Sequence, residues 1–308
     1  MRTLEQEQYH YSFNKNVKPA VSIDPGETVV VRTSDSVNKR IRTGTDPKEL
    51  DLLAHLDSSI VNPLSGPICV NGAKRGDTIT IDVVDIKVEP GWDQGWTGQL
   101  GVYGTMMSGS APNLLEPIPD IIKICRIDSK GIHFPLKKRE ILIPPAPSLG
   151  TIGTCPSIEA SSYSQGPFGG NMDSPDLVPG SKLYLPVFEE GGLVFVGDAH
   201  YLQGDGELTG PAVEVPSITT LTIGLIKGKK IDWPRIENSE YIMTVGNTRP
   251  LEDCVKTATV EMVRMLESEY GFDRWDAAIL LSAVCRLVVN QCQSVLYSVS
   301  CKFPKKYL

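Results

Sequence analysis

The sequence predicts a β-rich α+β fold in which packed antiparallel sheets form a sandwich-like or barrel-like body, with two helices late in the chain. Three observations lead to this prediction. Apolar and β-branched segments follow glycine-containing turns at three separate places. Longer runs with helical spacing of apolar residues occur only after Leu251. Strands and helices do not alternate along the chain as they do in a parallel α/β sheet.

Strands are predicted where apolar or β-branched residues run between turn signals. In chain order they are residues 28–33, 78–83, 121–127, 131–134, 182–188, 193–198, 213–215, 219–226 and 294–303. The turn Glu189–Gly192 separates two of these strands, which predicts a β-hairpin. Residues 89–118 and 144–170 are rich in glycine and proline and are predicted to be loops.

Helices are predicted at one early and two late places. They run from Pro47 to Leu56, from Leu251 to Tyr270, and from Trp275 to Asn290. Asp46 and Asp273 are the expected N-caps of the first and third helices, and Gly271 ends the second.

The 308-residue chain is 41% hydrophobic and 22% charged, which suffices for one large domain or two smaller ones. We expect an N-terminal β-rich part at residues 1–150 and a C-terminal β-rich part at 151–308 that carries the active-site loops and late helices. The net charge of -7 disfavours nucleic acid and anionic membranes as partners. The sequence has no apolar run long enough to span a bilayer, and its start lacks the apolar core of a signal peptide, so a cytoplasmic location is expected.

Two clusters of polar residues stand on glycine-rich turns. The first, PFGGNMD, spans residues 167–173, and the second, VGDAHYLQGDGE, spans residues 196–207. Asp198 and His200 are two residues apart on a predicted strand, so their side chains point to the same face. Gly204 and Gly206 allow the chain to fold back, so Asp205 or Glu207 could reach the same point. An aspartate, a histidine and a glutamate suit zinc or a similar divalent ion.

The first cluster supplies further candidates. The backbone amides of Gly169 and Gly170 could donate hydrogen bonds to an oxyanion. Asn171 and Asp173 could either join the site or form an Asx turn that caps the loop.

Several motifs together resemble the acetamidase/formamidase family. They are GGNMD, LYLPV, GDAH and QGDGE in that order, preceded by NPLSGPICVNGAKRGDTITIDVVDI and LGTIGTCP and followed by RPLEDCVKTAT. The resemblance runs from about Pro19 to the late helices. Two departures are Cys285 with Arg286, where the family has an acidic pattern, and Cys155, where a small apolar residue is commoner.

The resemblance implies hydrolysis of short aliphatic amides, formamide or acetamide, to a carboxylate and ammonia with a divalent metal, zinc or alternatively calcium. The family's metal motif maps onto Asp198, His200 and Glu207. Asp173 is the expected general base, because neighbouring anions raise the proton affinity of a carboxylate. The other predicted catalytic residues are Asn171, which would orient the amide, and Glu207, beside Asp173. The predicted substrate-binding residues are Gly169, Gly170 and Gln203.

Two alternatives remain open from the sequence. One is a non-catalytic β-rich protein that binds calcium structurally, although the imidazole of His200 is a poor ligand for a hard ion. The other is an amidase that uses Cys155 as nucleophile. The seven cysteines have no C-x-x-C spacing, and we interpret them as reduced, mostly buried thiols. The apolar helix and strand at the C-terminus are the expected face of a homodimer.

Overall fold

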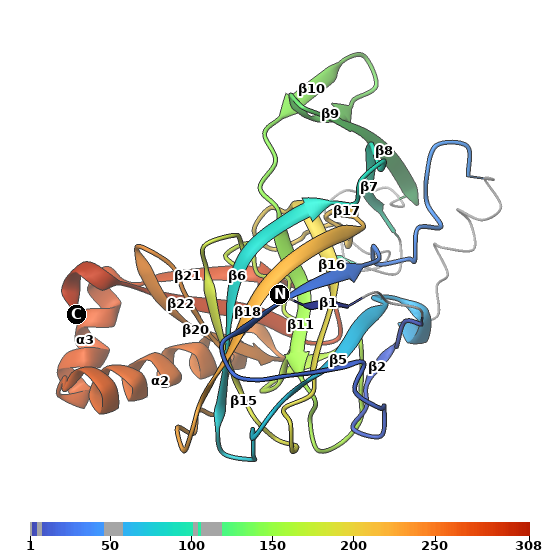
Figure 1. The fold of residues 1–308 in the computed structure, drawn as a ribbon. Coiled ribbons are helices and arrows are strands. Elements are labelled where there is room, and N and C mark those ends of the chain that lie inside the picture. Colours follow the sequence, from blue (N-terminus) through green and yellow to red (C-terminus); the bar gives the residue numbers. More distant parts are fainter. Residues whose placement is uncertain (1, 5–7, 46–57, 101–103, 106–118) are drawn as a thin grey trace.

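The computed structural model describes residues 2–4, 8–45, 58–100, 104–105 and 119–308. Within them the predicted fold class is confirmed: two large, mostly antiparallel sheets pack face to face, and two helices come late in the chain (Figure 1). The helix predicted at Pro47–Leu56 with its cap Asp46 lies outside the described residues, as does most of the predicted loop after residue 100.

The first sheet has nine strands among the described residues. Their spatial order is β1 (Arg2–Leu4), β4 (Glu27–Thr33), β18 (Ser217–Ile226), β6 (Thr78–Val88), β15 (Lys182–Pro186), β19 (Arg235–Glu237), β20 (Tyr241–Thr248), β22 (Tyr297–Pro304) and β21 (Arg286–Gln291). Only the β1–β4 pair in this described sheet is parallel. Buried and partly exposed residues alternate along β18, so this strand buries one face, as the period of a strand requires.

The second sheet has eleven strands among the described residues. Nine follow one path: β10 (Glu140–Ile143), β9 (Gly131–Pro135), β8 (Ile121–Asp128), β7 (Gln94–Gln99), β17 (Val213–Val215), β16 (Val194–Leu202), β11 (Ser148–Thr154), β14 (Gly169–Asn171) and β13 (Gln165–Gly166). β5 (Leu64–Val70) also pairs with β16, and β3 (Val21–Ile23) pairs with β5. A small separate sheet joins β2 (Ser12–Phe13) to β12 (Ala160–Ser161).

The main core lies between the two sheets. Ile81 and Leu183 of the first sheet and Leu149 and Val196 of the second belong to one fully buried apolar cluster. All residues of β11, and β16 as far as His200, are buried, so these central strands are covered on both faces. Such a strand provides a rigid support for polar side chains.

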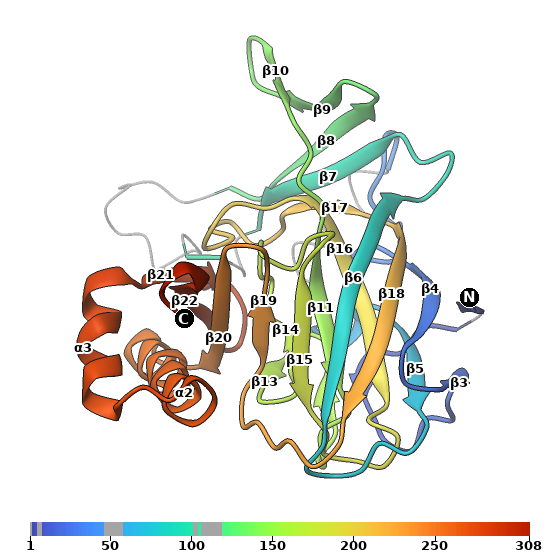
Figure 2. The same ribbon diagram turned by 60° about the vertical axis from the view of Figure 1, so that its left-hand side comes forward.

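The helices α2 (Leu251–Tyr270) and α3 (Arg274–Val284) pack beside β20 and β22 around a second apolar cluster (Figure 2). Gly271 ends α2 in the left-handed conformation, and the Asp273 carboxylate accepts hydrogen bonds from the amides of Trp275 and Asp276. Both caps are as predicted. Short 3₁₀ turns occur at η1 (Ser58–Ile60) and η3 (Lys305–Tyr307). Neither described helix combines the length and apolar character needed to cross a membrane.

The hairpin predicted around Glu189–Gly192 is wrong. β15 and β16 both exist, but β15 pairs with β6 and β19 in the first sheet, whereas β16 pairs with β11, β17 and β5 in the second. The turn therefore carries the chain from one sheet to the other. The residues of β16 are buried on both faces of the strand. The strand therefore pairs with its neighbours in the second sheet while the first sheet covers one of its faces.

The third predicted helix is too long. α3 ends at Val284, and residues 286–290 belong to β21, which pairs with β22. Leu287, Val288 and Val289 lie in this strand. A short apolar run with β-branched residues is compatible with helix or strand, and here the open edge of β22 favours the strand.

Strands also occur within both predicted loops. Gln94–Gln99 forms β7, and Ser148–Thr154 forms β11 at the centre of the second sheet. The boundary expected at residue 150 falls inside β11, and both sheets combine strands from either side of that position.

Candidate functional site

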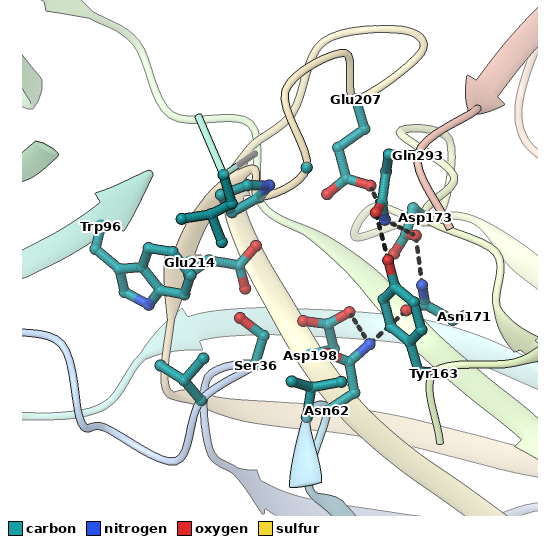
Figure 3. Close-up of a pocket in the computed structure, with 15 residues that line it drawn as sticks. Ser36, Asn62, Trp96, Tyr163, Asn171, Asp173, Asp198, Glu207, Glu214 and Gln293 are labelled. Carbon is teal, nitrogen blue, oxygen red and sulfur yellow. Dashed lines mark hydrogen bonds between the residues drawn. The ribbon is translucent and has the colours of Figure 1, made fainter. Parts of the chain in front are cut away.

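A cluster of ionisable side chains forms where β16 lies between β11 and β17. Within the described residues its five members are Asp173, Asp198, His200, Glu207 and Glu214. All are buried, with at most 6% of any residue exposed. Their possible ligand atoms form two groups that share His200, and within each group these atoms lie within 4.8 Å of one another. Figure 3 shows the four carboxylates around one cavity.

The strands set the first three positions. Asp198 and His200 point to the same face of β16, as their spacing predicted, and Asp198 Oδ1 lies 3.5 Å from His200 Nε2. Glu214 pairs directly with His200 across β16 and β17, and its Oε1 is also 3.5 Å from Nε2. The strand pairing therefore brings two carboxylates to one imidazole nitrogen.

Loops supply the other two carboxylates. Asp173 follows β14, and Glu207 lies on the turn after β16, with its Oε1 3.9 Å from His200 Nε2. Gly206 makes this turn possible with a φ of 86° and forms a bridge to Gln291. Of the two acidic residues expected to fold back, Glu207 reaches the site, whereas Asp205 is exposed to solvent.

Neutral groups hold one oxygen of each aspartate. Asp198 Oδ2 accepts hydrogen bonds from Asn62 Nδ2 at 3.0 Å and Thr151 Oγ1 at 3.1 Å. Asp173 Oδ2 accepts one from Asn171 Nδ2 at 2.8 Å. The Asn171 Oδ1 atom accepts in turn from Asn62 at 2.6 Å and, together with Asp198 Oδ2, shares the single hydroxyl proton of Thr151, whose Oγ1 is also 2.6 Å away. These contacts fix both carboxylates and turn their Oδ1 atoms toward the cluster.

Gln203 fixes the ring of His200 from behind. Its Nε2 donates to the carbonyl oxygens of Asp173 at 2.6 Å and Asn290 at 3.0 Å, so its Oε1 faces His200 Nδ1 at 2.8 Å. A neutral His200 therefore carries its proton on Nδ1 and directs the lone pair of Nε2 toward the carboxylates.

Several carboxylate oxygens have no hydrogen-bond partner although they are buried. In the described residues of the cluster they are Asp173 Oδ1, Asp198 Oδ1 and Glu214 Oε2. Leaving such atoms without a partner is costly. The 3.5 Å distances to Nε2 are too long for good hydrogen bonds, yet they resemble the spacing of about 3.4 Å between two tetrahedral ligands each about 2.1 Å from zinc. The residues present therefore fit a divalent cation.

The electrostatics of the cluster point the same way. Burial, followed by the charge of Asp198, raises the pKa of Asp173 to about 7. Burial also raises the pKa values of Glu207 and Glu214 well above their usual range, with neighbouring carboxylates adding to the effect. Burial lowers the pKa of His200, but Glu214 and Asp198 outweigh it, and the pKa lies well above its usual value. Positive charge is thus favoured at this point.

The backbone is strained at the same residues. Asp173, Asp198 and Glu207 have φ values of 46°, 56° and 45°, and Asn62 has a φ of 53°. This left-handed region is uncommon for residues other than glycine, least so for Asn and Asp. Such conformations persist where the surrounding structure enforces them, often at functional sites.

A small cavity of about 50 Å³ opens onto the cluster. Figure 3 shows Asn62, Tyr163 and Gln293 on one side of this cavity and Trp96 on another. Leu100 also contributes apolar surface to its described walls. None of the predicted substrate-binding residues Gly169, Gly170 and Gln203 is among the described residues that line the cavity. Both glycines lie in β14, packed closely between β11 and β13.

Gly150 of β11 leaves room for the cluster. In the antiparallel register it lies opposite Asp198, because Leu149 pairs with Ala199 and Thr151 with Gly197. A Cβ atom at this position would come within 2.7 Å of Asp173 Oδ1, Asp198 Oδ2 and His200 Cε1. Any larger residue would therefore displace the site's own side chains.

Sequence reasoning missed several members of the site. They are Asn62, Thr151, Tyr163, Glu214 and Gln293. Glu214 left one signal, since a glutamate between Val213 and Val215 in a predicted strand points to an ionisable group at a buried position. Asn62 and Gln293 lie in loops between strands, where a single amide side chain gives no such signal.

Cys155 lies away from the cavity. Its side chain belongs to an apolar cluster with Phe13 and Phe195 and is fully buried, and burial raises the pKa of its thiol to about 11. A thiol that resists ionisation is a poor nucleophile. The position therefore favours a packing role for Cys155.

A model of the acetamidase/formamidase family matches residues 1–165 and 165–295. The crystal structure of an acetamidase from Yersinia enterocolitica is similar to this one, with a TM-score of 0.90 and 35% sequence identity over 99% of this chain and 91% of that chain.

Two curated proteins are more distant relatives. A formamidase from Methylophilus methylotrophus is 24% identical over 71% of this chain and 64% of its own length. An acetamidase from Mycolicibacterium smegmatis is 24% identical over 71% of this chain and 66% of its own length. The chain thus spans slightly less than two thirds of the length of these relatives.

Proposed function

The chain belongs to the acetamidase/formamidase family, and from that premise we propose that it hydrolyses short aliphatic amides such as formamide and acetamide to a carboxylate and ammonia. The observation that carries the proposal is the buried cluster of four carboxylates around His200, with unpartnered oxygens beside a small cavity. The names of the relatives support the substrate class.

A divalent cation, zinc in the first place and calcium as the alternative, is proposed at the cluster. Asp198, His200 and Glu207 are the ligands expected from the sequence, and Glu214 joins them because its Oε1 lies 3.5 Å from His200 Nε2. One imidazole nitrogen among carboxylates favours zinc over calcium, since hard ions prefer oxygen alone. A cation held there supplies a Lewis acid that acidifies water and polarises an amide carbonyl.

Asp173 is proposed as the general base. Its Oδ1 is unpartnered, and in the protein without a cation burial and the charge of Asp198 raise the pKa of this carboxyl to about 7, so it binds a proton more readily than an ordinary aspartate. The carboxylate takes a proton from the attacking water and gives it to the amide nitrogen as the carbon–nitrogen bond breaks, so the amine leaves as ammonia. Asn171 donates to Asp173 and accepts from Asn62 and Thr151. These contacts support a role for Asn171 in fixing the position of the base, and not in orienting the amide.

The cavity supports a preference for short acyl groups. Val37, Val61, Trp96 and Leu100 contribute apolar surface next to the carboxylates, which suits a small apolar acyl group.

Ammonia release from formamide, acetamide and longer amides is the direct test. The protein should release ammonia from the two shortest substrates, lose this activity after chelation, and regain it when zinc is restored. The same assay with calcium identifies the active ion. A stable protein that binds zinc but never releases ammonia would contradict the proposal. A protein that unfolds on chelation without ever releasing ammonia would support the structural role for the ion.

Zinc affinity is expected to fall as the pH is lowered from 8 to 5. The raised pKa values of Asp173, Glu207 and Glu214 mean that these carboxyl groups bind protons more readily than usual. Zinc must displace the protons of the carboxyl groups that bind it, Glu207 and Glu214, so each proton displaced costs about tenfold in affinity per pH unit below the pKa of its group. Competition titrations with a chelator at several pH values measure the slope. An affinity that stays constant or rises toward acid pH would show that the carboxylates do not bind the ion.

We further propose a cytoplasmic homodimer. The described cysteines are free thiols, consistent with a reducing compartment. Trp275 and Ile279 lie one turn apart on α3 and are 70% and 71% exposed, which supports the C-terminal region as the subunit contact. Sedimentation of the purified protein measures the oligomeric state.

A further inference from the structure

Gln293 reaches the cavity from a different part of the chain than the strands that carry Asp198, His200 and Glu214. It lies between β21 and β22, and its side-chain amide stands beside Asp173, Glu207 and Tyr163 (Figure 3). The backbone amide of Gln293 donates to Gln291 Oε1 at 3.0 Å, which fixes the local turn. This segment therefore presents one defined polar side chain to the site.

The partners of the Gln293 amide determine its orientation. Nε2 donates to Glu207 Oε2 at 3.0 Å and lies 3.5 Å from Asp173 Oδ2, while Oε1 accepts from the Tyr163 hydroxyl at 2.7 Å. The reverse orientation would place the amide oxygen against a carboxylate. Tyr163 is 92% buried, with a relative exposure of 8%, so its hydroxyl is well placed to support this orientation.

Glu207 needs such support more than the other ligand candidates. It lies on a turn, its φ is 45°, and its side chain has one more rotatable bond than an aspartate. Asp198, by contrast, stands on a doubly buried strand and is held by two neutral donors. The hydrogen bond from Gln293 holds Glu207 Oε2 and leaves Oε1 on the side of His200, at 3.9 Å from Nε2.

We propose that Gln293, oriented by Tyr163, is a positioning residue that fixes Glu207 in the arrangement required by the cation. This inference rests on the proposed cation site and extends it to a residue and a segment outside the sequence motifs. Groups that hydrogen-bond to a metal ligand fix its orientation, and their loss commonly weakens metal affinity by about 10- to 100-fold. An uncharged amide does so without changing the net charge of the cluster.

The test measures zinc binding to the metal-free protein by competition with a chromophoric chelator. Gln293→Met keeps the length of the side chain but removes the donor, and we expect zinc affinity about 10- to 100-fold weaker. Tyr163→Phe should weaken affinity in the same direction by a smaller factor. The double variant should lose less than the product of the two single losses, because both residues act on one carboxylate.

Two further readouts separate positioning from other roles. The melting temperature of the metal-free Gln293→Met protein should stay close to that of the parent, whereas a folding defect would lower it. Excess zinc should restore kcat for acetamide, whereas the loss of a direct substrate contact would persist and appear in KM. Val295→Ala, a change in an exposed residue of the same segment, is the matched control and should leave zinc affinity unchanged.

The outcomes distinguish this inference from the proposed function. If the parent binds zinc and releases ammonia but Gln293→Met binds zinc equally well, the positioning role is overturned and the proposed function stands. Single losses that multiply fully in the double variant would overturn the coupling of Tyr163 to Gln293. A parent that binds neither zinc nor calcium and releases no ammonia overturns both.

Discussion

Gly150→Ala is expected to abolish zinc binding and amide hydrolysis while the protein still folds. The new Cβ would lie 2.7 Å from Asp173 Oδ1, Asp198 Oδ2 and His200 Cε1, and these side chains cannot move without breaking the hydrogen bonds that fix them. We expect at least about 100-fold weaker zinc binding, since disturbing even the outer contacts of ligands costs 10- to 100-fold. Overpacking should also lower stability by about 1–3 kcal/mol. Chelator competition, ammonia release and thermal denaturation measure the three effects.

Gly204→Ala is the matched control for this prediction. Gly204 lies close to Glu207 in the sequence, yet a Cβ atom there would meet nothing within 4 Å. Zinc affinity and activity should stay within a few-fold of the parent. If Gly150→Ala were as active as Gly204→Ala, the cluster at β11 would not be the site of catalysis.

Glu214→Gln is expected to have the largest effect after Gly150→Ala. Zinc affinity and kcat/KM should each fall at least about 100-fold, because the loss of even an outer contact of a metal ligand costs 10- to 100-fold. Glutamine keeps the size of the side chain but removes the negative charge that faces His200 Nε2 at 3.5 Å. The metal-free variant should be more stable than the metal-free parent, because burial makes the Glu214 carboxylate unfavourable, as its raised pKa indicates. Zinc titration, kinetics and thermal denaturation without metal measure these opposite changes.

Glu190→Gln is the control for Glu214→Gln, since it makes the same chemical change at an exposed position. It should alter neither zinc affinity nor metal-free stability. If Glu214→Gln kept full zinc affinity, Glu214 would have no part in binding the ion. If it lost activity and metal-free stability together, the glutamate would have a structural role.

The motifs predicted that Asp198, His200 and Glu207 would converge, because these motifs are local. Asp198 and His200 share a face of one strand, and glycines allow Glu207 to return, so spacing alone brings three of the five ionisable groups together. Glu214 reaches His200 only through the pairing of β16 with β17. Such a partner depends on sheet order, which spacing within one segment does not reveal.

The errors in the fold have a similar origin. The turn Glu189–Gly192 has the composition of a hairpin turn, but whether the next strand pairs back or crosses to a facing sheet depends on which faces must be buried. β11 lies in residues 144–170, which the glycine and proline content predicts to be a loop, and its own glycines Gly150 and Gly153 are required by close neighbours. For Gly150 these neighbours are the side chains of the buried cluster, so the packing of that cluster overrode the usual preferences of a strand.

The double burial of β11 and β16 has a consequence for how the protein loses activity on heating. Amide hydrogens in central, fully covered strands exchange with solvent only through openings that approach global unfolding in free energy. The strand-borne part of the cluster is therefore expected to exchange more slowly than the exposed described segments. We therefore expect the strand residues of the cluster to lose their arrangement at the same temperature at which the protein melts cooperatively. Within the cluster, local opening below that temperature should involve only the turns that carry Glu207 and Gln293.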